Sequence, residues 1–124
     1  QELLRALISE EVSRGIASAE KAEDLRGAMS ALLTFIATHD ALRFIAVSEP
    51  TVFGRMMAAT ADSLWVTFRE ECDRLFEKHG VSSAVQRDVL TRILVSSVII
   101  PVVDVDALVA SALAKSSRGG ATLF

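Results

Sequence analysis

Residues 83–100 read SAVQRDVLTRILVSSVII, and this stretch indicates which kind of fold the chain forms. Ser83 followed three residues later by Gln86 is typical of a capping box at a helix N-terminus, and Pro101 cannot continue a helix. The stretch therefore predicts a helix over residues 83–100. One side of this helix is mainly apolar along its whole length, and we expect that side to face the core. Its members are Val85, Val89, Leu90, Ile93, Ser97 and Ile100.

The opposite side of the same helix begins polar, at Arg87 and Asp88, and becomes apolar in its second half. A helix that is apolar all round must be covered on both sides. We expect the second cover to come from another copy of the chain, because two-fold homodimers are the commonest oligomers; the alternative is that the two C-terminal helices are ordinary core helices. The predicted dimer interface joins this face to the small-residue face of a last helix: Thr91, Leu94, Val95, Val98, Ile99, Ala107, Ala110, Ser111 and Ala114.

Helical patterns also account for the rest of the chain. Every fourth residue from Leu4 to Ile16 is apolar, which predicts an amphipathic first helix. Pro50 suits the first turn of a long helix, and Gly80 is placed to end it. The predicted helices are residues 1–19, 23–38, 41–47 with Asp40 as N-cap, 50–79, 83–100, and 104–115 with Asp104 as N-cap.

The predicted fold class is all-α. We expect an orthogonal or antiparallel bundle of about six helices that dimerises through its last two long helices. Residues 1–115 would form one domain, and residues 116–124, which include Gly119 and Gly120, would form a flexible tail.

Composition and charge narrow the classes of function. The 124 residues suit one domain, and with 51% hydrophobic residues the chain is too apolar to be disordered. The 13 basic residues are outnumbered by 16 acidic ones and form no run, so we expect this chain not to bind DNA by itself. The longest apolar run, residues 93–103, is too short for a membrane helix.

The start of the sequence and its cysteine content predict a location. The chain begins with Gln1 rather than Met and shows no secretory signal, so we expect a fragment of a longer protein. Cys72 stands alone, which excludes an intramolecular disulfide and suits a reducing compartment. We therefore expect a cytoplasmic protein.

Residues that could carry chemistry are few and scattered. His39 and His79 are far apart in sequence, and the spacing needed for helix-borne zinc or di-iron ligands does not occur. Cys72 lies on an apolar helix face without a neighbouring histidine, which favours a buried structural thiol. We therefore expect no enzymatic activity, no metal and no cofactor.

Aromatic and methionine side chains gather in the middle of the chain, which favours a site for a small apolar molecule. Hydroxyl groups among them would supply a few orienting hydrogen bonds. The alternative is that the same residues form an ordinary core. The candidate ligand-binding residues are Leu32, Phe35, Ile36, Phe44, Phe53, Met56, Met57, Thr60, Leu64, Trp65, Phe68, Ile93 and Ser97.

Three stretches resemble one family of proteins. Residues 1–8, QELLRALI, are similar to the helix that follows the DNA-reading helix of TetR-family transcriptional regulators. Residues 38–50, THDALRFIAVSEP, are similar to the mid-domain H-P-x-L-R…E-P passage of that family, with Asp40 in place of the usual proline. Residues 92–98, RILVSSV, resemble the R-x-x-x-S element of its penultimate, dimerising helix.

This resemblance implies the C-terminal effector-binding and dimerisation domain of a bacterial transcriptional regulator. It implies a homodimer held by a four-helix bundle and a cavity for a small apolar effector between the central helices. The N-terminal helix-turn-helix domain of the family is absent from this chain, so no DNA-binding residue is assigned. The alternative is a helical protein-interaction module with a solid core and no ligand.

Overall fold

The computed structural model describes residues 2–56 and 64–118, and the regular structure in these residues is helical throughout. The predicted all-α class is therefore confirmed. The described helices are α1 (Glu2–Glu20), α2 (Leu25–Thr38), α3 (Asp40–Ser48), α4 (Pro50–Met56), α5 (Leu64–Lys78), α6 (Ala84–Ile99) and α7 (Val105–Arg118).

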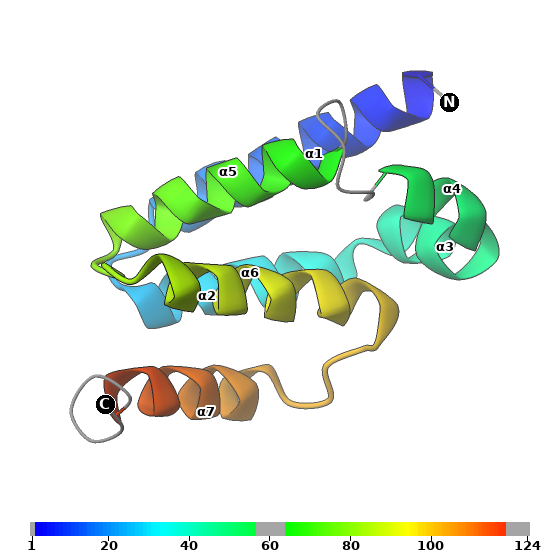
Figure 1. The fold of residues 1–124 in the computed structure, drawn as a ribbon. Coiled ribbons are helices and arrows are strands. Elements are labelled where there is room, and N and C mark those ends of the chain that lie inside the picture. Colours follow the sequence, from blue (N-terminus) through cyan, green and yellow to red (C-terminus); the bar gives the residue numbers. More distant parts are fainter. Residues whose placement is uncertain (1, 57–63, 119–124) are drawn as a thin grey trace.

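The helices stack in three layers (Figure 1). Helices α1 and α5 form one outer layer, α2 and α6 form the middle layer, and α7 lies beyond α2 as the other outer layer. The short helices α3 and α4 pack together at one end, where α3 also contacts α6. Helix α2 contacts α1, α6 and α7, and is thus the central helix of the bundle.

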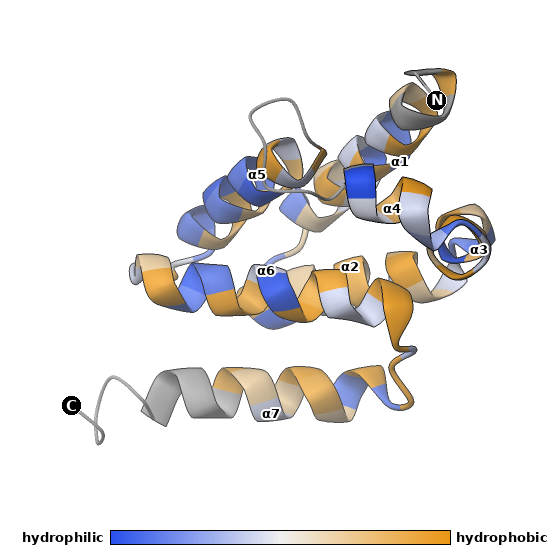
Figure 2. Cartoon of the chain, turned by 45° about the vertical axis from the view of Figure 1, so that its right-hand side comes forward, coloured by the Kyte–Doolittle hydropathy of each residue, from blue (hydrophilic) through white to orange (hydrophobic). Residues whose placement is uncertain are grey.

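The central position of α2 follows from its sequence. It buries Ala28, Met29, Leu32, Leu33 and Ile36, which cover more than one side of the helix. A helix that is apolar over so wide an arc is stable only between other helices. By contrast, α5 carries hydrophilic residues on its outer side (Figure 2).

The length and hydropathy of the described helices show whether any of them could cross a membrane. None of the described helices is by itself long and apolar enough to cross a bilayer. Helices α2 and α3 reach the required length and hydropathy only when joined, and they are bent by 63° at their junction. The apolar character of α2 is accounted for by its burial in the bundle.

Helix boundaries follow the local signals in the sequence. The Ser83 hydroxyl accepts a hydrogen bond from the Gln86 amide at 3.2 Å, and the Asp104 carboxylate accepts one from the Ala107 amide at 3.0 Å. Both predicted N-caps are therefore confirmed. Gly80 ends α5 with a φ of +94°, in the left-handed region that glycine tolerates best.

The N-cap predicted at Asp40 is wrong by one residue. His39 caps α3, because its Nδ1 accepts a hydrogen bond from the Leu42 amide at 3.1 Å. Asp40 is the first residue of the helix itself, where its negative charge still favours the helix N-terminus.

The single helix predicted over residues 50–79 is also wrong. Helix α4 packs against α3, whereas α5 packs against α1 and α6, and the connecting residues 57–63 lie outside the described part of the chain. The apolar pattern could not reveal the break, because Phe53 and Leu64 are eleven residues apart, close to three helical turns. Residues 116–118, predicted as tail, belong to α7.

The third correction concerns the rotation of α6. Val85, Val89 and Ile100, predicted to face the core, are 75%, 48% and 69% exposed. Leu90 and Ser97, also predicted to face the core, are buried, but α6 buries Arg87, Thr91, Leu94 and Val98 beside them.

Arg87 explains this rotation. Its Nε donates a hydrogen bond to Asp73 Oδ1 at 2.7 Å, and its Nη1 donates to the carbonyl oxygens of Val81 and Ser82, both at 2.9 Å. These partners lie on α5 and in the α5–α6 turn, so the guanidinium must point inward to reach them. In a helical sequence pattern, an arginine usually indicates the side that faces solvent. Here the guanidinium of Arg87 has hydrogen-bond partners inside the protein, so Arg87 marks the buried side of α6.

We predict that Arg87→Met lowers the free energy of unfolding by about 2–4 kcal/mol, because it leaves two carbonyls and one carboxylate without their donor. Arg92→Met on the same helix is the matched control. Arg92 is largely exposed and, within the described part of the chain, forms an ion pair with Asp88 at 2.7 Å, so its loss should cost less than about 0.5 kcal/mol. Urea denaturation of both variants measures the difference, and equal effects would contradict this account of the rotation.

Candidate functional site

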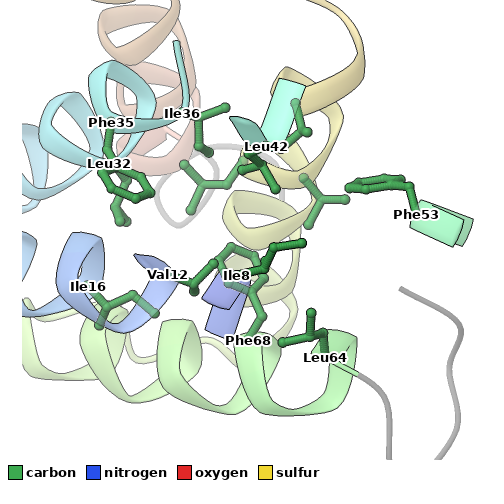
Figure 3. A pocket seen from close by; sticks show the side chains of 13 residues that line it. Ile8, Val12, Ile16, Leu32, Phe35, Ile36, Leu42, Phe53, Leu64 and Phe68 are labelled. Atoms are coloured by element: carbon green, nitrogen blue, oxygen red, sulfur yellow. The ribbon is translucent and has the colours of Figure 1, made fainter. Parts of the chain in front are cut away.

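A cavity of about 50 Å³ lies inside the bundle, and Figure 3 shows the side chains that line it. In this view Leu32 and Phe35 reach it from α2, Val12 comes from α1, and Phe68 comes from α5. Among the described residues, the lining consists of Ile8, Val12, Ile16, Leu32, Phe35, Ile36, Leu42, Phe53, Leu64, Phe68, Leu94, Val95 and Val98. The cavity is thus formed by side chains from six helices, α1 to α6.

The lining is chemically uniform. Each of the described side chains that line the cavity is an aliphatic or phenylalanine side chain. A polar molecule placed here would lose its hydrogen bonds to water without replacement, whereas a hydrocarbon would lose only contact with water. The cavity therefore suits neutral apolar molecules.

Phe35 owes its place in the lining to contacts on two sides. On α1, Gly15 leaves room for the ring: a Cβ atom at this position would come within 3.0 Å of a Phe35 ring carbon. Beyond the end of α2, the His39 ring packs against Phe35 with ring centroids 5.2 Å apart and a 53° tilt. The Phe35 ring is therefore positioned by α1 and by the α2–α3 junction.

Six of the predicted ligand-binding residues meet at this cavity, and they come from α2, α4 and α5. They are Leu32, Phe35, Ile36, Phe53, Leu64 and Phe68.

The other predicted residues are placed elsewhere. Phe44 is 64% exposed on α3, and Trp65 lines a separate surface recess with Arg92. Ser97 is buried without lining the cavity, and its hydroxyl proton is donated to the Leu94 carbonyl at 2.6 Å. The expectation of orienting hydroxyl groups is therefore wrong for Ser97.

Of the remaining predicted ligand residues, Ile93 packs against the hydrophobic core without lining the cavity. Met57 and Thr60 lie outside the described residues, as does the side chain of Met56.

Sequence reasoning missed the other half of the lining. Ile8, Val12 and Ile16 belong to the stripe that identified the first helix as amphipathic, but that stripe was not connected with the site. Leu42 follows the capping histidine of α3. Leu94, Val95 and Val98 were predicted for the dimer interface, because the predicted core side of α6 did not extend as far as these residues.

The predicted dimer interface is accordingly corrected in part. Thr91, Leu94 and Val98 are buried within one chain, at 1%, 0% and 7% exposure, and cannot contact a second copy. The other predicted interface residues are exposed or partly buried: Val95, Ile99, Ala107, Ala110 and Ser111. The side chain of Ala114 lies outside the described residues.

A different apolar face of α6 is left uncovered. Val85, Val89, Ile99 and Ile100 lie on the side opposite Arg87 and are each about half exposed or more. We call these four residues the α6 strip. Arg92 and Ser96 lie between them on the same side.

Groups that could act as nucleophiles or metal ligands do not form a centre in the described residues. Within residues 2–56 and 64–118, His, Cys, Asp and Glu side chains form no cluster of three or more that could hold a metal ion. Cys72 is fully buried on α5. Burial, and secondarily the negative charge of Glu71, raises the pKa of its thiol to about 12.

We predict that Cys72 does not react with Ellman's reagent in the folded protein near about pH 8, because only the thiolate attacks and a raised pKa leaves little of it. In concentrated guanidinium the thiol becomes exposed and should react fully, which serves as the control. Rapid reaction under native conditions would contradict the burial of Cys72.

Comparison with known proteins adds no constraint on this site. Neither a family model, nor a curated protein, nor a solved structure matches the chain.

Proposed function

We propose that this chain is the effector-sensing and homodimerisation domain of a TetR-like bacterial transcriptional regulator. A small apolar molecule in the cavity would alter DNA binding by an N-terminal domain outside this sequence. The observation that carries this proposal is the apolar cavity, to which α1 contributes Ile8, Val12 and Ile16. In the family that the sequence resembles, a helix like α1 follows the DNA-reading helix.

The size of the cavity supports a mechanism in which binding moves helices. A cavity of about 50 Å³ holds a few water molecules, whereas about 150 Å³ accommodates benzene. An aromatic effector would therefore fit only in a wider arrangement of the bundle. Such an effector shifts the population toward that arrangement, because it binds it better than the narrow one.

Helix α1 is the element best placed to respond. It packs against α2 and α5, the two helices that face it across the cavity. If α2 and α5 move apart, the surface against which α1 packs changes. The change would reach the DNA-binding domain through the N-terminal end of α1.

The chemistry of the lining defines the class of effector. Burying an unpaired polar group costs about 1–3 kcal/mol, and among residues 2–56 and 64–118 the lining supplies no hydrogen-bonding side chain. The effector would be a compact, uncharged molecule whose buried part is hydrocarbon or halogenated hydrocarbon.

Homodimerisation is the second part of the proposal. The α6 strip presents four β-branched aliphatic side chains to solvent, each worth about 1.5–3 kcal/mol when fully buried. Ala107 and Ser111 on α7 are exposed and small, which allows close approach of a second helix. We propose that α6 and α7 of two copies form a four-helix interface in a cytoplasmic protein.

One observation favours the alternative of a helical interaction module without a ligand. The cavity is small enough to be an ordinary packing defect in a core. The two functions differ in whether an apolar molecule binds inside the bundle, and fluorobenzene binding distinguishes them.

We predict that fluorobenzene binds the chain with saturation and that Val12→Phe abolishes this binding, because the new ring fills the cavity. Val52→Phe is the matched control: Val52 packs partly buried against the core but does not line the cavity. Fluorine NMR line broadening measures binding. Absence of binding to the unmodified chain would favour the interaction module, and equal loss in both variants would place the probe elsewhere.

We also predict that the chain sediments as a dimer and that Ile99→Glu makes it monomeric, because a charge would be buried within the α6 strip. Val47→Glu is the control, since Val47 is a comparably exposed aliphatic residue on α3. Analytical ultracentrifugation distinguishes the two. A monomeric unmodified chain, or dissociation by both variants, would refute an interface at the α6 strip.

A further inference from the structure

We infer that His39 makes the cavity responsive to pH: protonation of its imidazole releases two residues that line the cavity and weakens the binding of apolar molecules. This inference rests on the proposed function of the cavity as a ligand site. It concerns how binding is regulated and adds a role for a residue that does not itself line the cavity.

The hydrogen bonds of His39 define its neutral state. Nδ1 accepts from the Leu42 amide at 3.1 Å, so this nitrogen cannot carry a proton. The ring proton therefore lies on Nε2, which faces Glu11 Oε2 on α1 at 3.3 Å. The side chain is 17% exposed, so water reaches the ring from one side.

The His39 ring contacts two residues that line the cavity. Leu42, whose amide His39 holds, lines the cavity with its side chain, and so does Phe35, against which the imidazole packs. The imidazole thus connects the N-terminus of α3 to the end of α2 and to α1.

Protonation changes these contacts unequally. With a proton on both nitrogens, the ring can no longer accept from the Leu42 amide, and the N-cap of α3 is lost. The new positive charge also faces the positive end of the α3 helix dipole. The ring is then driven to turn away from the α3 N-terminus, which frees Leu42 and removes the packing surface of Phe35.

The charged groups around His39 act in opposite directions. Glu11 on α1 attracts the imidazolium, but its other oxygen already accepts from Arg14 at 2.9 Å. On α3, Asp40 attracts it and Arg43 repels it. The loss of the cap, which does not depend on these charges, governs what protonation does to the cavity.

The test measures fluorobenzene affinity by fluorine NMR in the unmodified chain and in two variants. Between about pH 7.5 and about pH 5.5, where histidine ordinarily changes charge, affinity should fall about fivefold in the unmodified chain, the effect expected for one N-cap. His39→Asn keeps a good capping residue that does not titrate, so its affinity should be equal at both pH values. His79→Asn is the control and should keep the full pH dependence.

A second readout does not require the probe. In NMR spectra recorded without fluorobenzene, the Leu42 amide signal (proton–nitrogen) and the Phe35 ring signals (proton–carbon) should shift when His39 is protonated. They should not shift in His39→Asn. Probe binding that is independent of pH, together with Leu42 and Phe35 signals that do not follow His39, would overturn the inference while leaving the proposed function intact. Absence of fluorobenzene binding at every pH would overturn both.

Discussion

The inward position of the Arg87 guanidinium is the constraint on which the rest of the structure depends. Three acceptors surround it, one carboxylate and two carbonyls, and all belong to α5 or to the turn before α6. A buried guanidinium without such partners would cost several kcal/mol, so rotations of α6 that turn Arg87 away from them are excluded. One side chain thereby determines the rotation of a whole helix.

That rotation creates both candidate surfaces at once. It turns Leu94, Val95 and Val98 into the cavity, and it leaves the α6 strip outside. The cavity and the proposed dimer interface are therefore opposite faces of one helix about 10 Å across. A molecule that displaces α6 from inside necessarily displaces the interface, so the two parts of the proposed function are mechanically connected.

The sequence predicted the elements well where local chemistry decides them. Ser83, Asp104 and Gly80 act through their own hydrogen bonds or backbone angles, and each is placed as the pattern indicated. The rotation of α6 could not be predicted in the same way, because it depends on Asp73, which is fourteen residues from Arg87 and on another helix.

The candidate site shows the same division. Residues on α2 and α5 were found because aromatic and aliphatic side chains recur there at helical spacing, whereas the contribution of α1 requires knowing that α1 packs across from α2. Hydrophobic periodicity states which side of a helix is buried but not which helix covers it.

If the cavity is the proposed ligand site, its described apolar lining would select among apolar molecules by their volume and shape. Each additional methylene changes the binding free energy by about 1–3 kcal/mol at most, so the lining distinguishes size classes better than related molecules of one size. Discrimination between molecules of the same size must come from groups that alter the shape of the lining. Gly15 and His39 are such groups, because the first leaves room for the Phe35 ring and the second supports it. Selectivity in this bundle therefore depends on residues behind the cavity wall as much as on the wall itself.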